Sequence, residues 1–303
     1  MRFIFTLLLC LWFGPASAQW SEGRGWLTGA GWLPLAKSGV AFVGSGDIVG
    51  GWQVWYGLRA FSAAKRGTKA INVCNVSDVA CADFLTDATT GALVVTTVGG
   101  SDCSVVVCTI KTLYDQSGAL ACTGACDNTQ ATISARPTLK TTCPGLTIPC
   151  AQFTTAPQEF NAATLAASTS QPFSMSMVYN RFSGTTYGGG LSFTSPDARF
   201  AAEGAPNQIQ VYTGTVLDAT AADATFIAAN AIFSNANCAV MVNGTDTGPA
   251  SCGTNGAGST IQINFPTGQP INQYFGEAGM TALGFTSGNR TSLNSNQRAF
   301  WGF

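Results

Sequence analysis

Apolar and polar residues alternate with a period of two through most of the chain beyond residue 90. In residues 173–182, Phe173, Met175, Met177 and Tyr179 alternate with serine and asparagine, which predicts a strand with one buried face. Further β-like runs are separated by clusters of Gly, Pro, Asn and Ser: 92–98, 105–114, 207–214, 238–244, 259–265 and 275–285. Many short strands with few helices predict an all-β antiparallel sandwich.

Two segments favour a helix instead. Residues 55–67 place Leu58 and Phe61 on one helical stripe, and Gly67 follows two basic residues as a stop signal. We therefore expect one short N-terminal helix there. Residues 289–303 predict one short C-terminal helix whose final aromatic residues dock on the body. Between the helices, Asn243 and Gly244 after an apolar run predict a tight hairpin.

The first residues predict export. A basic Arg2, an apolar stretch over 3–13 and the small residues 16–18 form a signal peptide with an A-x-A-type cleavage site, so we assign 1–18 to it. We expect the protein in the periplasm, on the cell surface or outside the cell. No later run approaches the roughly 20 apolar residues of a spanning helix, so no membrane span is expected.

Residues 19–45 form an irregular leader rich in Gly and Trp. We interpret its tryptophans as anchors that pack on the body, and the alternative is that they stack on sugar rings. The remaining residues, 46–303, can form a single β-rich domain with a large core.

Cysteine spacing predicts a disulfide framework. Ten cysteines follow the signal peptide, and an even number suits an oxidising compartment. They fall into close sequential couples: Cys74 with Cys81, Cys103 with Cys108, Cys122 with Cys126, Cys143 with Cys150, and Cys238 with Cys252. We predict five local disulfides in that order, although other pairings are possible in principle. A zinc or other metal site is not expected, because the chain has no histidine and no Cys-x-x-Cys.

Composition removes several classes of function. Charged residues make up 10% of the chain and the net charge is −1, so nucleic acid and anionic membranes are poor partners. Without histidine there is no Ser-His-Asp triad and no HExxH site, and no phosphate-binding loop occurs, so we expect no cofactor. Of the common types of catalysis, the one that these exclusions leave is catalysis by carboxylate side chains. Retaining hydrolysis of a glycosidic bond needs two carboxyl groups about 5–5.5 Å apart.

One short stretch looks like an active-site loop but is better explained as a turn. In TLYDQSGAL, residues 112–120, Asp115 and Gly118 occupy the first and fourth places of a four-residue turn. That combination is typical of a type I turn, in which the carboxylate accepts backbone N–H groups. We therefore assign Asp115 and Gly118 a structural role, with catalysis by Asp115 as the alternative.

Several motifs in this order resemble a known family. They are a helix-and-strand segment at 58–73, CSVVVC at 103–108, then YDQSG, DNTQA at 127–131, Arg-Pro at 136–137, and the final segment from Glu277. The chain resembles the catalytic domain of α-L-arabinofuranosidase B and its bacterial look-alikes. This resemblance implies a concanavalin-like or lectin-like sandwich of the jelly-roll type. It also implies a retaining glycoside hydrolase that acts on arabinofuranosyl-containing polysaccharide.

The chain departs from that family where the catalytic groups are expected. The family's nucleophilic Glu lies in a V-D-M-E-like strand, and the comparable run 207–216 has no acid. The proton-donating Asp precedes the last strand, and residues 265–272 have no acid there. The family's adjacent cysteine pair is also missing. The remaining catalytic candidates are Glu203 and Asp218, which flank the first of these runs.

Two interpretations of function therefore stay open. The protein is an exported glycoside hydrolase whose carboxylates have shifted, or it is a glycan-binding or structural sandwich that has lost them. Polysaccharide or glycan is the expected partner in both the hydrolytic and the binding interpretation. Glu277 matches a family glutamate at the start of the last strand, and we interpret it as a hydrogen-bonding residue at a strand edge.

Overall fold

The structure is a computed structural model, and it describes residues 41–303 except 155–157, 184–187, 195–196, 203–206 and 265–271. The expected signal peptide, most of the leader and Glu203 lie outside the described residues. Contacts within Ala41–Phe303 group this range into one unit, to which the following description refers.

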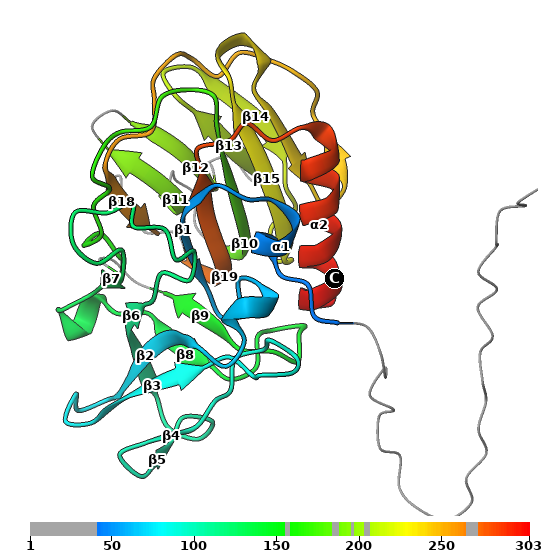
Figure 1. Cartoon of the computed structure of the whole chain (residues 1–303). Coiled ribbons are helices and arrows are strands. Elements are labelled where there is room, and N and C mark those ends of the chain that lie inside the picture. Colours follow the sequence, from blue (N-terminus) through cyan, green and yellow to red (C-terminus); the bar gives the residue numbers. More distant parts are fainter. Residues whose placement is uncertain (1–40, 155–157, 184–187, 195–196, 203–206, 265–271) are drawn as a thin grey trace, which may run out of the picture. The chain divides into compact units, whose positions relative to one another are not determined.

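The large sheet runs through the middle of this unit (Figure 1). Within the described residues it has 12 strands, and its path joins ten of them. In spatial order these are β17 (Thr245–Asp246), β16 (Ala239–Val242), β15 (Ile227–Phe233), β10 (Phe173–Ser183), β19 (Asn272–Thr281), β9 (Cys150–Phe153), β8 (Thr138–Lys140), β6 (Cys108–Leu113), β2 (Lys69–Asn75) and β3 (Cys81–Leu85). Strand β1 (Trp52–Gly57) pairs with β19, and β7 (Asn128–Thr129) pairs with β6.

The small sheet packs against one face of the large sheet. The described residues give it five strands in the order β14 (Val216–Thr220), β13 (Gln208–Tyr212), β12 (Ala198–Ala202), β11 (Gly188–Thr194) and β18 (Thr260–Ile263). A separate two-stranded ribbon joins β4 (Thr97–Val98) to β5 (Ser101–Asp102). All pairings between these strands are antiparallel, so the expected all-β antiparallel sandwich is confirmed.

Aromatic rings fill the space between the two sheets. Phe173 of β10 stacks on Phe233 of β15 with ring centroids 4.6 Å apart. Phe200 of β12, in the small sheet, meets Phe233 edge-on at 6.5 Å. All three side chains are fully buried, so they mark the inner faces of both sheets. Since strand residues alternate between faces, this also fixes which side chains point outward.

Helix α2 (Ser287–Trp301) covers the other face of the large sheet, where it packs against β15 and β16 (Figure 1). Its buried Gln297 donates to Ser176 Oγ at 2.9 Å and accepts from Asn230 Nδ2 at 3.1 Å. Trp301 lies over Gly276 of β19, where a Cβ would approach the indole ring to 2.7 Å. We call this side of the large sheet the covered face.

The two helix predictions have opposite outcomes. The C-terminal helix is confirmed, because α2 begins at Ser287, where Thr286 caps it by accepting from Asn289 N–H, and ends at Trp301. The helix predicted for 55–67 is wrong, since the chain there forms the end of β1 and a 3₁₀ turn, η1 (Ala63–Lys65). The short N-terminal helix of the structure is α1 (Ser45–Ile48) instead.

Tertiary packing explains the failed helix. Leu58 belongs to the main core, whereas Phe61 belongs to a second cluster beside Trp52 and Phe285, so the two do not form one stripe. Residues of β1 pair with β19, whose glycines leave room for large side chains: a Cβ on Gly279 would lie 2.4 Å from the ring of Trp55. Strand pairing and aromatic burial override the weak helical pattern.

Most predicted strands are present with shifted ends. The 92–98 run supplies only the two residues of β4, and β6 begins at Cys108, which leaves Val105–Val107 outside a strand. The hairpin is confirmed, since Asn243 and Gly244 both have positive φ between β16 and β17.

The ten cysteines within residues 41–303 form five disulfides, and they join the couples that the spacing predicts. Each bridge closes a loop of 4 to 14 residues. In the part of the chain that the structure describes, no helix is long and apolar enough to cross a membrane.

Candidate functional site

The outward side of the small sheet carries a concentration of polar side chains. Ile209 and Val211 of β13 are fully buried in the core, so alternation directs Gln210 and Tyr212 to the other side. The corresponding positions of the neighbouring strands complete what we call the polar face: Asp218, Gln210, Tyr212, Arg199, Ser192 and Gln262.

One row of this polar face crosses four strands in register. Tyr212 pairs with Arg199, Arg199 with Ser192, and Ser192 with Gln262. The Arg199 guanidinium lies over the Tyr212 ring, 5.1 Å from its centroid. Ser192 Oγ lies 3.3 Å from Gln262 Oε1 and donates to it. The row thus places a ring, a cation, a buried hydroxyl and an amide side by side.

Gln210 is a buried amide without a partner in the described part of the chain. Its side chain is 3% exposed, and no described residue forms a hydrogen bond with its amide. Other amides also have unpartnered buried atoms, among them Asn180 Oδ1 and Asn264 Oδ1. Gln210 sits opposite Asp218 on one side and Ala201 on the other, at cross-strand Cβ separations of about 5 Å. Buried amides normally have partners, so the unpartnered amide of Gln210 is a candidate group for hydrogen bonding to a ligand hydroxyl.

Two described carboxylates lie at the polar face: Asp218, and Asp197, which forms an ion pair with Arg199. Asp218 is exposed on β14, an edge strand of the small sheet. The structure places it beside Gln210 and not beside a second acid. The other catalytic candidate, Glu203, falls in the 203–206 segment outside the described residues. The described residues therefore give no distance between the two candidates, and their pairing stays a prediction.

Half of the described side-chain carboxylates other than Asp218 form ion pairs. Ion pairs join Arg59 to Glu277, Lys69 to Asp83, Arg136 to Asp78, Arg181 to Asp223, Arg199 to Asp197, and Arg290 to Asp246. Cys74, Asp78 and Cys81 also bring three potential metal ligands together. The two sulfurs form a disulfide and Asp78 pairs with Arg136, so this group does not suit a metal ion.

Asp115 and Gly118 serve the fold. Asp115 Oδ1 accepts from Trp55 N–H at 2.8 Å and from Ser117 N–H at 3.0 Å, and Gly118 has a φ of 72°. Among the described residues no backbone bond joins Gly118 N–H to the Asp115 carbonyl, so the segment is an Asx-type bend and not a hydrogen-bonded type I turn. The bond from Trp55 N–H also anchors β1 to this bend. Burial raises the pKa of the Asp115 carboxyl, and the nearby Asp127 raises it further.

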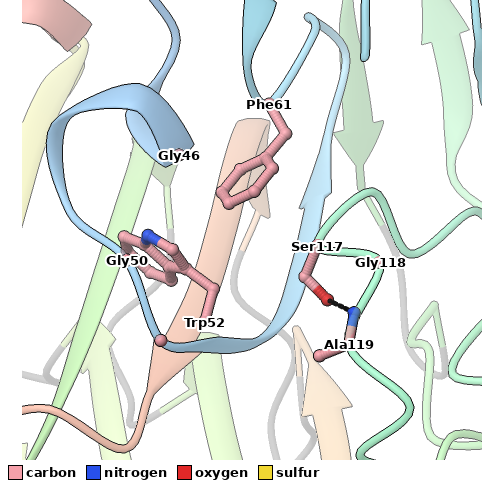
Figure 2. Close-up of a pocket in the computed structure, with 8 residues that line it drawn as sticks. Gly46, Gly50, Trp52, Phe61, Ser117, Gly118 and Ala119 are labelled. Carbon is pink, nitrogen blue, oxygen red and sulfur yellow. Dashed lines mark hydrogen bonds between the residues drawn. The ribbon is translucent and has the colours of Figure 1, made fainter. Parts of the chain in front are cut away.

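A small hollow opens beside this bend (Figure 2). Its volume is about 300 Å³, and Trp52 and Phe61 face the segment from Ser117 to Ala119 across it. The remaining lining residues are Gly46, Gly50 and Gly51. Since this lining has no carboxylate and no cation, the hollow offers a hydroxyl and backbone groups but no acid–base chemistry.

The interpretation of Glu277 as a strand-edge residue is wrong. It lies inside β19, which has neighbours on both sides, and its side chain is fully buried. Its two oxygens accept from Arg59 Nε at 2.6 Å and Nη2 at 2.8 Å. Arg59 also donates to Ser45 and Asn296 and lies 4.7 Å from the Phe300 ring centroid. The pair ties β19 to both helices.

Sequence reasoning missed the polar face and this ion pair for different reasons. The pattern of residues 207–214 predicts a strand. Its polar side, formed by Gln208, Gln210 and Tyr212, carries no acid and therefore matches no catalytic motif. The alternation itself could have revealed it. Arg59 and Glu277 are 218 residues apart and no local pattern connects them.

The comparisons with known proteins identify the fold. Neither a protein-family model nor a curated protein sequence matches the chain. Among solved structures, an arabinofuranosidase complexed with arabinofuranosyl-α-1,2-xylobiose matches with a TM-score of 0.63 and 16% identity. A mutant GH54 α-L-arabinofuranosidase soaked with 4-nitrophenyl α-L-arabinofuranoside matches with a TM-score of 0.63 and 15% identity. A GH54 α-L-arabinofuranosidase soaked with a cyclic sulfate inhibitor matches with a TM-score of 0.62 and 15% identity.

Each match covers 86% of this chain and 65% or 66% of the other. The chain therefore spans slightly less than two thirds of those proteins. At this low identity the likeness shows the fold, a GH54-like β-sandwich, and the fold implied by the sequence motifs is confirmed.

Proposed function

We propose that the protein is an exported glycan-binding sandwich that recognises arabinofuranosyl-containing polysaccharide through its polar face. The observation that carries this proposal is the row of amide, hydroxyl, cation and ring groups, with the unpartnered amide of Gln210 beside it. Sugar hydroxyls pair well with amides, and an aromatic ring stacks on a sugar face. The similarity to sugar-bound arabinofuranosidases supports the choice of sugar.

The scarcity of carboxylates on this face favours binding over hydrolysis. A retaining mechanism requires a nucleophile and a proton donor about 5–5.5 Å apart. Gln210 faces Asp218, and an amide can neither attack as a carboxylate nor donate an acidic proton. Such a face binds a sugar without cleaving it.

Affinity electrophoresis in gels that contain arabinan or arabinoxylan tests this function. We expect retardation of the purified protein, and we expect Gln210→Ala to abolish it. Gln152→Ala is the matched control, because Gln152 is a partly buried amide on β9 of the large sheet. No retardation on any arabinofuranosyl polymer, or equal loss with both variants, would contradict the proposal.

Hydrolysis is the second candidate function, and Asp218 on the polar face is the observation that favours it. A chromogenic arabinofuranoside reports turnover directly. The hydrolytic proposal requires release above background that Asp218→Asn or Glu203→Gln abolishes. Turnover that survives both substitutions excludes these two residues as the catalytic carboxylates.

A further inference from the structure

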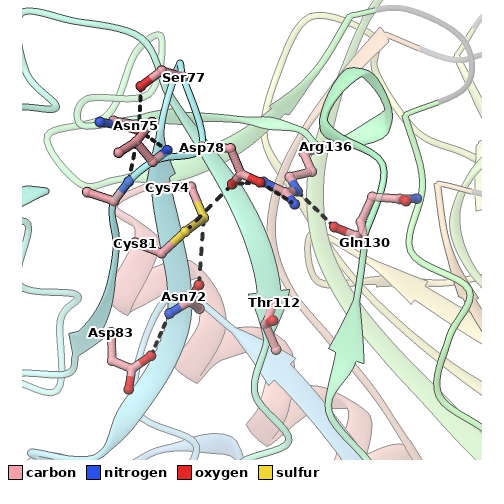
Figure 3. The surroundings of a disulfide bond; sticks show 12 residues. Asn72, Cys74, Asn75, Ser77, Asp78, Cys81, Asp83, Thr112, Gln130 and Arg136 are labelled. Carbon is pink, nitrogen blue, oxygen red and sulfur yellow. Dashed lines mark hydrogen bonds and ion pairs between the residues drawn. A yellow bond between two sulfur atoms is a disulfide. The ribbon is translucent and has the colours of Figure 1, made fainter. Parts of the chain in front are cut away.

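One carboxylate of the polar face carries a charge that no described cation neutralises. Asp218 is exposed on β14 and forms no ion pair with any described residue. Asp78 shows the opposite case, because Arg136 Nη1 lies 2.5 Å from its carboxylate (Figure 3). The field of a paired carboxylate is largely cancelled, whereas an unpaired one acts on any charged group that comes close. Asp218 therefore sets the electrostatics of its side of the polar face.

The cross-strand neighbours of Asp218 are uncharged. Gln210 of β13 lies directly opposite it. The pairs on either side are likewise uncharged: Gln208 with Thr220, and Tyr212 with Val216. The Cβ atoms of a cross-strand pair lie about 5 Å apart, so a ligand group that bonds to the Gln210 amide also comes close to the Asp218 carboxylate.

Arg199, the cation of the polar row, does not compensate for this charge. Its Nε donates to Asp197 Oδ1 at 3.0 Å, and its Nη2 donates to Asp197 Oδ2. Arg199 also lies on β12, with β13 between it and the strand of Asp218. The described part of the polar face thus sets two carboxylates against one guanidinium, which leaves one negative charge.

We infer that Asp218 is a specificity-determining residue, which makes the polar face select uncharged glycan chains over chains that bear carboxylates. The inference rests on the proposed function and names the class of glycan that the same site takes. Hydroxyl groups of a neutral sugar can donate to the Asp218 carboxylate and bond to the Gln210 amide. A carboxylate on the sugar instead brings two negative charges together. Two unit charges about 4 Å apart in water correspond to a discrimination of about fivefold in affinity.

Two polymers that differ in charge but not in backbone test this selectivity. They are hydroxyethyl-arabinan and carboxymethyl-arabinan of equal substitution, whose substituents have similar size. Isothermal titration calorimetry at low salt should show that the unmodified protein binds the hydroxyethyl polymer about fivefold more tightly. In 1 M NaCl, where the screening length is about 3 Å, we expect the ratio of the two affinities to approach one.

A pair of substitutions assigns the selectivity to Asp218. Asp218→Asn removes the charge and keeps the shape and an acceptor oxygen, so the ratio of the two affinities should fall to about one at low salt. Asp102→Asn is the matched control, because it changes the net charge by the same amount. Asp102 is also exposed and forms no ion pair with any described residue, but it lies on the β4–β5 ribbon, away from the small sheet (Figure 1). That variant should keep the fivefold ratio.

Three results would overturn this inference and leave glycan binding in place. They are equal affinity of the unmodified protein for both polymers, a preference that survives in Asp218→Asn, and a preference lost equally in Asp102→Asn. A protein that binds neither these polymers nor unmodified arabinan contradicts the proposed function itself, and the inference fails with it. Circular dichroism melting verifies that each variant is folded. The salt series uses the unmodified protein, so it tests the charge effect even if a substitution prevents folding.

Discussion

Two buried glutamines on opposite sides of the sandwich are in contrasting states. Gln297 on the covered face uses both ends of its amide, toward Ser176 and Asn230. Gln210 on the polar face is almost equally buried but has no partner among the described residues. A satisfied buried amide stabilises the fold, whereas an unsatisfied one costs free energy. The covered face also holds unpartnered atoms, such as Asn230 Oδ1 and Asn294 Oδ1, so the contrast concerns these two glutamines and not the two faces as a whole.

The largest effect should come from the ionic centre of the covered face. Replacing Glu277 with Ala leaves the Arg59 guanidinium buried without its partner, so we expect a loss of about 3–5 kcal/mol in the free energy of unfolding. Urea denaturation measures it.

The double variant Arg59→Met with Glu277→Leu is the control for that experiment. It removes both charges and keeps apolar volume, so it should lose much less than the two single substitutions combined. A double variant as unstable as the sum of the singles would show that charge burial is not the cause.

A matched pair of substitutions tests the contrast between the bonded amide of Gln297 and the unpartnered amide of Gln210. Gln297→Ala removes two hydrogen bonds from the covered face, and we expect a loss of about 2 kcal/mol in unfolding free energy. Gln210→Ala should cost less than Gln297→Ala, since it removes packing of a buried side chain but no bond to a described residue. Equal losses in urea denaturation would mean that Gln210 is structural, and they would remove the main support for the glycan site.

The aromatic ring of the polar face should affect binding more than stability. Tyr212→Ala removes the ring that carries the Arg199 guanidinium, and we expect arabinofuranosyl polysaccharide to bind up to about tenfold more weakly. Tyr212→Phe, which keeps the ring, should retain most of the affinity. Isothermal titration calorimetry distinguishes them, and an equal loss in both variants would argue against stacking.

The smallest effect concerns Asp115, which borders the covered face but forms no ion pair with any described residue. Its raised pKa means that the folded state holds the proton to higher pH than the unfolded state. Its contribution to stability therefore falls as the pH rises from about 3.8 through the raised value.

Asp115→Asn removes this titration. The unfolding free energy of the unmodified protein, minus that of the variant, should decrease across that interval. Urea denaturation at several pH values measures the difference. A difference that grows with pH would reverse the assigned sign.

Local signals explain which parts of this molecule the sequence could predict. The alternation in 173–182, the Asn243-Gly244 turn and the capped tail each depend on neighbouring residues, and each element is present. Residues 55–67 fail because their conformation depends on β19, more than 200 residues away. Motif order identified the fold because the same sandwich constrains many short turns at once.

The site was harder to anticipate because it depends on spatial neighbours. The missing acids in 207–216 were visible in the sequence, but the row formed by Tyr212, Arg199, Ser192 and Gln262 depends on the register of four strands. Gln210 could be placed on a strand face from alternation alone. The burial of Gln210 without a hydrogen-bond partner could not be predicted, because this burial depends on what surrounds the small sheet.

The local disulfides have a consequence for how the chain matures. The ten cysteines between residues 41 and 303 are bonded as five couples of consecutive cysteines. If the chain is exported from its N-terminus, as we propose, each couple can be oxidised before the next couple emerges. The native pairing then needs no contact between distant segments, because each bridge spans at most 14 residues.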